Sequence, residues 1–263
     1  HWVWGGGWLA AKRVRHIAGG LVVHLTSGAA AAAAVLVLGP RKGLGRDKFM
    51  PHNLPMTLLG TGLLWFGWFG FNSGSALAVD GIAATDFVNT HVAGMAGLAM
   101  WVGLEWFLYK QPTTLGAASG AIAGLATVTP AAGFINPHAA VFIGLLAGLA
   151  CFTAVTYKNK AGFDDSLDVV GIHGLGGVIG TICLGIFASK AINPGGADGL
   201  LAGNPSFLAT QIFGVIIVGV YAFVVSFVLL KIIDVICGGL RLSPEDESLG
   251  LDQAAHSETA YHM

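Results

Sequence analysis

Seven long apolar runs constrain what this chain can fold into. A helix needs about 20 mostly apolar residues to cross roughly 30 Å of hydrocarbon. The runs that meet this requirement cover about residues 18–38, 54–72, 88–109, 114–134, 139–157, 167–188 and 206–237. Charged residues make up only 10% of the chain, whereas a soluble domain carries about a quarter. The sequence therefore predicts an all-α, polytopic membrane protein with about seven transmembrane helices.

Basic residues gather in alternate connections between these runs. They are Arg41, Lys42, Arg46 and Lys48 after the first run, Lys110 after the third, Lys158 and Lys160 after the fifth, and Lys231 and Arg241 at the end of the seventh. Loops 73–87 and 135–138 hold none, and 189–205 holds Lys190 alone. Because cytoplasmic loops are enriched in Lys and Arg, we expect a cytoplasmic C-terminus. Three basic residues before the first run, Lys12, Arg13 and Arg15, depart from this pattern.

The chain divides into a transmembrane domain, residues 1–237, and a polar, acidic tail, residues 238–263. The tail is either a solvated end or, given the cap and turn signals of Ser243-Pro244-Glu245, an ordered docking segment. The formal net charge of -1 gives no reason to expect a nucleic-acid partner.

Two histidines, His24 and His173, lie inside apolar, glycine-rich runs. An ionisable group is costly within a bilayer and usually marks a pathway or a ligand site. A neutral imidazole donates at one nitrogen and accepts at the other, so two facing rings could share a proton and leave their outer nitrogens for a small polar guest. Each histidine lies roughly 10 Å in from its own end of the membrane. Spacing alone does not show that the two rings meet.

Aromatic and hydroxyl residues end the second run on its outer side. Trp65 suits an interfacial aromatic belt, whereas Phe71, followed by Asn72 and Ser75, suits a gate at the mouth of a site. Trp4, also on the outer side, offers an indole face that would attract a small cation by about 0.5–2 kcal/mol. A desolvated cation that carries N–H groups would also need acceptors such as the Ser75 hydroxyl.

Three aspartates, Asp164, Asp165 and Asp168, precede the run that contains His173. Carboxylates at this position cap the first N–H groups of a helix and interact well with its dipole. A proton relay is the alternative interpretation.

These features together resemble the Amt/Mep/Rh ammonium transporter family, and in particular its bacterial Amt branch. The motifs that carry the resemblance are Trp4-Gly5-Gly6-Gly7, Ala18-Gly19-Gly20 through His24, Pro51–Met56, Gly67–Ser75, Ala118–Leu125, Asp164-Asp165 through Gly177, Gly250-Leu251-Asp252 and Ala260-Tyr261. The resemblance implies a homotrimer in a cell membrane, with one pore in each subunit, built from two inverted five-helix repeats and a final helix. It implies transport for nitrogen uptake rather than an enzymatic activity, and no cofactor or metal.

The resemblance also implies a role for six residues. Trp4 and Ser75 would hold ammonium in an outer vestibule, Phe71 would close it, and Trp68 would lie beside the lumen. His24 and His173 would be the twin pore histidines. A P-II-type nitrogen-regulatory protein would bind the cytoplasmic face.

Two departures from the family pattern are visible. The match begins at what would be the fifth of eleven helices, so we expect a chain truncated at its N-terminus that does not conduct ammonium alone. His16-Ile17 stand where the family usually has an Asp-Phe pair before Ala18.

Two other functions are compatible with a pair of intramembrane histidines. One is electron transfer by a haem with His24 and His173 as its axial ligands, and the other is a pore for a different small neutral solute.

Overall fold

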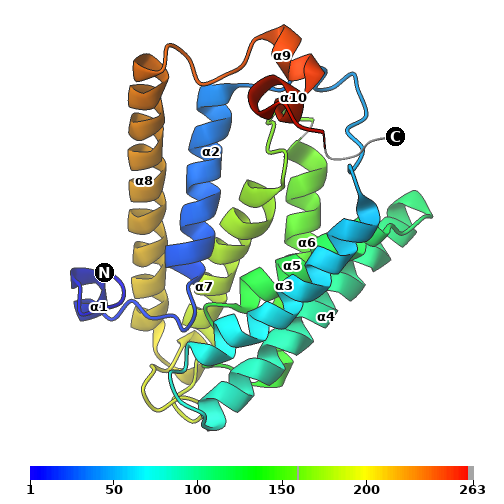
Figure 1. Ribbon diagram of the computed structural model, residues 1–263. Helices are drawn as coiled ribbons and strands as arrows, with labels where there is room; N and C mark the ends of the chain where they lie inside the picture. The colour runs from blue at the N-terminus through cyan, green and yellow to red at the C-terminus, as the bar shows by residue number, and fades with distance from the viewer. Residues whose placement is uncertain (159, 260–263) are drawn as a thin grey trace.

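The computed structural model describes residues 1–158 and 160–259, and every regular element within these ranges is helical. Most of the described chain forms long helices (Figure 1). They are η1 with α2 (Gly20–Leu25, Thr26–Leu38), α3 (Leu54–Gly74), α4 (Gly81–Tyr109), α5 (Thr114–Val128), α6 (Pro137–Lys158), η2 with α7 (Val170–Gly174, Leu175–Phe187) and α8 (Pro205–Ile236). Short elements are α1 (Trp8–Ala11), η3 (Leu200–Ala202), α9 (Pro244–Leu249) and α10 (Leu251–His256). The elements η1 and η2 are π-helical turns.

Within the described residues, six helices are long and apolar enough to cross a membrane. They match six of the seven predicted runs, and the predicted fold class is confirmed. The fourth run, 114–134, is helical only to Val128, so α5 has 15 residues. Pro130 follows two residues later, and its missing N–H favours the turns that the chain forms there.

Helix α4, which corresponds to the third predicted run, begins at Gly81, seven residues before the predicted start of that run. Asp80 is the reason, because its Oδ1 accepts hydrogen bonds from the N–H groups of Ile82 and Ala83, at 2.9 and 3.0 Å. An aspartate at the N-cap satisfies donors that have no partner within the helix. The earlier start places Asp86 within α4, whereas the predicted boundaries leave it in the loop 73–87.

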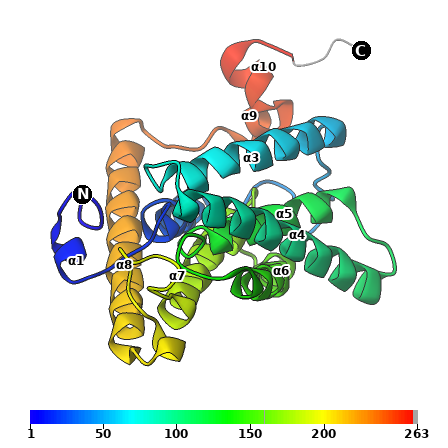
Figure 2. The ribbon, with the colours of Figure 1, turned by 90° about the horizontal axis from the view of Figure 1, so that it is seen from below.

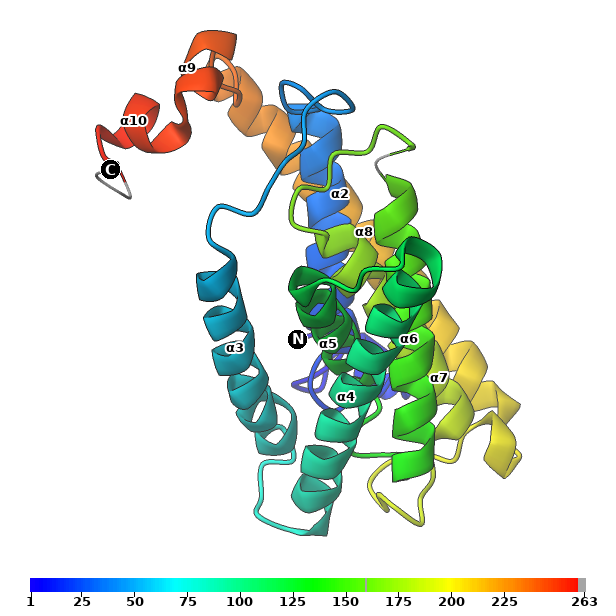
Figure 3. The ribbon, with the colours of Figure 1, turned by 90° about the vertical axis from the view of Figure 1, so that its right-hand side faces the viewer.

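The helices form two packed groups. Helices α4, α5 and α6 pack against one another, and α2 packs against α8 and the start of α7. Helix α3 packs on α4 and α5 at one edge of the molecule (Figure 3). Only 6% of the residues in the most apolar 18-residue segment of α3 are buried, and only 11% of those in the corresponding segment of α8. Apolar faces this extensive require lipid or further protein to cover them.

The N-terminal segment packs against α8 (Figures 1 and 2). The indole of Trp2 lies 4.5 Å from the ring of Tyr221, and that of Trp8 lies 6.2 Å from Phe213. The chain then passes to η1, which begins after Gly19. This route brings Trp4, His16 and Ile17 into the lining of one cavity with Ser75, at the end of α3, and Ile82, at the start of α4.

Of the three aspartates before His173, only Asp165 caps the helix. Its carboxylate accepts hydrogen bonds from the N–H groups of Val169, Val170 and Gly171, at 3.0, 2.7 and 3.3 Å. The prediction of a capping role is therefore confirmed for Asp165. It is wrong for the other two, because each has a basic partner instead: Asp164 pairs with Arg41 and Asp168 with Lys158.

The Arg41–Asp164 pair joins the end of α2 to the segment before η2. The Arg41 guanidinium contacts both carboxylate oxygens, at 2.6 to 3.0 Å, and the Arg41 N–H donates to Oδ2 at 2.6 Å. The side chain of Asp164 is buried. The hydrogen bond from Arg41 holds the pKa of Asp164 below its usual range.

We expect Asp164→Asn to lower stability by about 1–3 kcal/mol at neutral pH, because it removes a charge-assisted hydrogen-bond acceptor. A carboxyl with a lowered pKa in the folded state stabilises the fold above its unfolded pKa of about 4. That contribution is lost as the pH falls through the folded pKa. The wild-type chain should therefore lose stability below about pH 4, and the variant should lack this part of the acid dependence. Thermal unfolding between pH 3 and 7 tests this prediction, and Asp252→Asn, at an exposed position, is the control. The prediction is contradicted if the wild-type chain, Asp164→Asn and Asp252→Asn lose stability equally as the pH falls.

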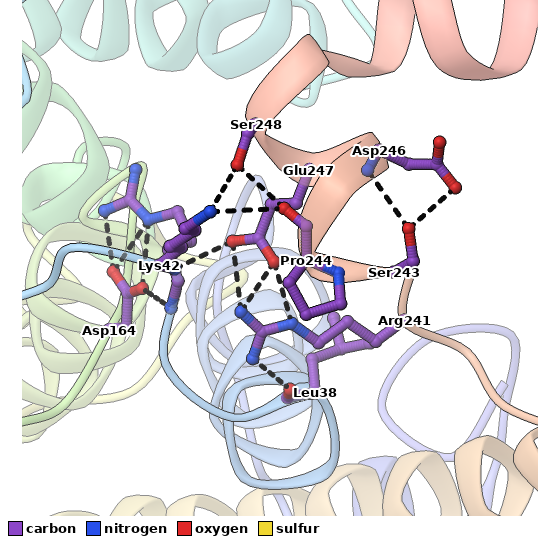
Figure 4. Close-up of polar contacts among 10 residues, drawn as sticks. Leu38, Lys42, Asp164, Arg241, Ser243, Pro244, Asp246, Glu247 and Ser248 are labelled. Carbon is purple, nitrogen blue, oxygen red and sulfur yellow. Dashed lines mark hydrogen bonds and ion pairs between the residues drawn. The ribbon is translucent and has the colours of Figure 1, made fainter.

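The C-terminal helices dock on the connection after α2 (Figure 4). Glu247 of α9 accepts from the Lys42 N–H at 2.8 Å and from the Arg241 guanidinium at 2.7 Å. The Lys42 ammonium donates to Ser248 Oγ, and Arg241 also donates to the carbonyl of Leu38. The tail thus forms two short helices, of which α9 is held to the connection after α2, and a docking role for the tail stays a prediction. The Ala260-Tyr261 motif lies outside the described residues.

Candidate functional site

The two histidines both lie on π-helical turns. His24 lies near the end of η1, which follows Gly19 with a φ of +123°, a conformation that glycine adopts readily. His173 lies near the end of η2, whose N–H groups Asp165 caps. A π-helical turn changes the direction of the side chains that it carries and is frequent at functional sites.

The structure brings the two imidazoles into contact. His24 Nδ1 and His173 Nδ1 lie 3.1 Å apart, and the ring planes are 28° from parallel. At this distance one nitrogen donates a proton and the other accepts it. His24 is almost fully buried, and its Nε2 has no hydrogen-bond partner. The pair therefore shares one proton internally and leaves Nε2 of His24 for another group.

Two aromatic rings of α3 cover the pair. Trp68 stacks on His24 at a centroid distance of 5.4 Å and on His173 at 6.5 Å, within 16° of parallel. Phe71 meets both His24 and Trp68 edge-on, at 6.0 and 5.8 Å. The predicted site residues His24, His173, Trp68 and Phe71 thus form one cluster.

Thr129 holds the Trp68 indole in this stacked position. The indole Nε1 donates to Thr129 Oγ1 at 3.0 Å, and the hydroxyl donates to the carbonyl of Leu125 at 2.7 Å. Both residues are buried. Thr129 was not predicted as a site residue, because the residue lies in the run 114–134, which was predicted to be a regular helix.

We expect Thr129→Val to cost about 1–3 kcal/mol of stability, because it leaves the buried indole N–H without an acceptor. Thr153→Val is the matched control: Thr153 also bonds to a carbonyl of its own helix, that of Leu149, but is exposed and has no indole on it. Thermal unfolding of the two variants should separate them by this amount. Equal melting temperatures would mean that the Thr129–Trp68 bond contributes nothing.

Trp4 and Ser75 line a separate cavity of about 1020 Å³ at the C-terminal end of α3. His16 lines it as well, with its ring 4.8 Å from that of Trp4. Ser75 Oγ donates to the carbonyl of Phe71 at 2.7 Å, so its lone pairs remain available to accept from a guest. Through this bond the cavity adjoins the Phe71 end of the histidine cluster.

His16 is more deeply placed than its position before the first span suggests. The side chain is buried and neither ring nitrogen has a hydrogen-bond partner. Burial lowers the pKa of His16 to about 3, so the ring is neutral at physiological pH. A neutral imidazole has one donor and one acceptor nitrogen, and both are buried here.

Comparison with known proteins finds matches that cover almost the whole chain. The model of the Ammonium Transporter Family matches residues 1–261. The ammonium transporter of Bacillus subtilis is 49% identical over 262 residues, which are 99% of this chain and 64% of that protein. Ammonium transporter Amt1 of Archaeoglobus fulgidus is 46% identical over 99% of this chain and 66% of its own length.

Solved structures show the same fold. The crystal structure of Saccharomyces cerevisiae Mep2 superposes with a TM-score of 0.89 at 37% sequence identity, and the match covers 99% of this chain and 62% of that one. The chain thus spans less than two thirds of the length of these relatives. A family model that matches nearly every residue, relatives that are identical at almost half of the matched positions and a shared helical fold lead to one conclusion: this chain is a membrane protein of the ammonium transporter family.

Proposed function

We propose that this chain forms part of a pore that transports ammonium or ammonia across a membrane, and that it is not an enzyme. The observation that carries the proposal is the contact between the buried imidazoles of His24 and His173, 3.1 Å apart at Nδ1. A proton shared between the rings leaves a nitrogen of each for the guest. The curated relatives from Bacillus subtilis and Archaeoglobus fulgidus bear the name ammonium transporter.

In this mechanism a cation enters from the outer cavity. The Trp4 indole attracts it by a cation–π interaction, and the Ser75 hydroxyl, whose proton is already donated to Phe71, accepts a hydrogen bond from it. Phe71 separates this cavity from the histidines, and Trp68 forms a flat apolar wall beside them. A species that loses its hydration shell and passes Phe71 would meet the ring nitrogens of His24 and His173.

The geometry disfavours the haem alternative. A bond between a metal ion and an imidazole nitrogen is about 2 Å long, so a metal held between two imidazoles requires roughly 4 Å between their nitrogens. The nitrogens that face each other here are 3.1 Å apart.

We place the protein in the plasma or inner membrane as a homotrimer, with its C-terminus in the cytoplasm. The exposed apolar faces of α3 and α8 support burial in lipid or against neighbouring subunits. A P-II-type regulatory protein would bind the cytoplasmic end, where the tail, Arg41 and Glu247 line a cavity of about 520 Å³. A solved relative of 31% identity is titled a sensor Amt protein.

The transport proposal is tested with a chimera in which this chain replaces the matching part of the Bacillus subtilis ammonium transporter. Reconstituted vesicles should show saturable methylammonium uptake and an ammonium-driven change of internal pH. The 263-residue chain alone is measured beside it and should give no saturable flux, because pores of inverted-repeat proteins are lined from both halves. A chimera that inserts and trimerises yet passes no ammonium would refute the proposal, and water permeability above that of empty vesicles would favour a pore for another solute.

A further inference from the structure

A fully buried polar cluster lies on α4, away from the histidine pair. Asp86, Asn89 and Thr90 occupy positions i, i+3 and i+4 of the helix and therefore share one of its faces. Asn72 reaches the cluster from α3, and its Nδ2 donates to Thr90 Oγ1 at 3.0 Å. The Thr90 hydroxyl donates in turn to Asp86 Oδ1 at 3.1 Å. All four side chains have no exposed surface.

The cluster has more acceptors than donors. Asp86 Oδ2, Asn89 Oδ1 and Asn72 Oδ1 are buried and have no hydrogen-bond partner. The Asn89 amide nitrogen is already committed to the carbonyls of Ala132 and Ile135, at 2.7 Å each. Among the described residues, no basic side chain forms an ion pair with Asp86. A buried carboxylate that lacks a positively charged neighbour and a donor for one of its oxygens is strongly unfavourable, so either a proton on Asp86 or a bound species must supply donors to the cluster.

The cluster lies directly behind the wall of the outer cavity. Gly133 separates the two: a Cβ at this glycine would lie 3.3 Å from Asp86 Oδ2 and would overlap the Ile17 side chain. Ile17, Ile82 and Phe134 all line the cavity. A small cation that enters the cavity has therefore only the thickness of these side chains to cross before it reaches Asp86.

We propose that Asp86, Asn89 and Asn72 form a binding site for one ammonium ion, separate from the pore. Three of the four N–H donors of ammonium would serve the three unpartnered oxygens, one of which belongs to the Asp86 carboxylate, and its positive charge would match that carboxylate. A proton on Asp86 Oδ2 would supply a single donor for the other two oxygens. A bound water would supply two donors and no charge. The site does not depend on His24 or His173.

The test is the thermal unfolding of the purified 263-residue chain in lipid nanodiscs, titrated with ammonium chloride. Sodium and potassium chloride at matched ionic strength are the comparison. His24→Ala/His173→Ala serves as the background, so that ligand at the proposed pore site does not contribute. We expect a rise in melting temperature of about 5 °C once ammonium is in hundredfold excess over its Kd. Asp86→Asn should abolish the rise, and the exposed Asp47→Asn should retain it.

A second measurement keeps the proposal falsifiable if Asp86→Asn does not fold. Infrared difference spectra of the His24→Ala/His173→Ala chain with ¹⁴N- and ¹⁵N-ammonium should show carboxylate bands that change on binding. A protonated carboxyl band that ammonium does not alter overturns the proposal in favour of a neutral Asp86. Equal stabilisation by sodium or potassium overturns it in favour of a metal-cation site, and no ammonium-dependent rise overturns it outright.

Discussion

Replacing both His24 and His173 with alanine is expected to lower ammonium flux through the chimera about 100-fold. In the proposed mechanism each imidazole would offer a desolvated guest one hydrogen bond worth about 1.4 kcal/mol, and each such loss is a factor of ten. The pair also carries the shared proton across a 3.1 Å contact, which alanine cannot do. The measurement is stopped-flow acidification or alkalinisation of proteoliposomes after an ammonium jump.

The control is a double variant with the same change in composition. His138 and His256 are both exposed and outside the cluster, so His138→Ala/His256→Ala should leave flux within a factor of about two. The single variants His24→Ala and His173→Ala should each remain impaired, because either change breaks the pair. Flux at the parent rate in the His24/His173 double variant, with normal trimer yield, would rule out a role for the pair in transport.

A single methyl group at Gly28 is expected to separate the two histidines. A Cβ there would overlap the backbone of Gly174, the residue that directly follows His173. Because backbone cannot move aside like a flexible side chain, Gly28→Ala should push α2 away from η2 and cost about 1–3 kcal/mol of stability. The displacement should also lengthen the His24–His173 contact beyond hydrogen-bonding distance, so that ammonium flux falls with stability.

Gly60→Ala is the matched control for Gly28→Ala. Gly60 also lies within a long helix, but a Cβ there would have no atom within 4 Å. Removing a glycine from a helix interior stabilises it by roughly 0.5–1 kcal/mol. The two variants should therefore shift the melting temperature in opposite directions, and equal shifts would show that the α2–η2 approach tolerates a side chain.

Much of the fold could be predicted from the sequence, because its strongest signal is a series of apolar runs that are long enough to cross a membrane. The boundaries that failed did so for local reasons. Asp80 begins α4 early, and a proline two residues after Val128 ends α5 early. An apolar run is recognised from the average hydropathy of about 20 residues, so a single cap residue or proline has little effect on its predicted boundaries. The Asp164–Arg41 pair was not predictable for a different reason: its partners are 123 residues apart.

The candidate site was predictable by residue type but not by geometry. His24 and His173 stand out because intramembrane imidazoles are rare, yet only the folded chain shows that their rings touch. Asp86 was missed because the predicted start of the third span left it in a loop. Its spacing to Asn89 and Thr90, three and four residues on, is the signal that would have revealed a polar helix face. Thr129 carries no such signal, since a threonine in an apolar run usually bonds to its own helix.

The π-helical turns under the two histidines make the pair sensitive to chain length as well as to residue identity. Each such turn closes its backbone bonds over one residue more than an α-helical turn does. A one-residue deletion within Gly20–Leu25 would leave a continuous α-helix, but it would rotate the ring of His24 by about 100° relative to the preceding chain. In genetic variants of this protein, an in-frame loss of one codon at η1 or η2 would therefore uncouple the two rings even though both histidines are retained.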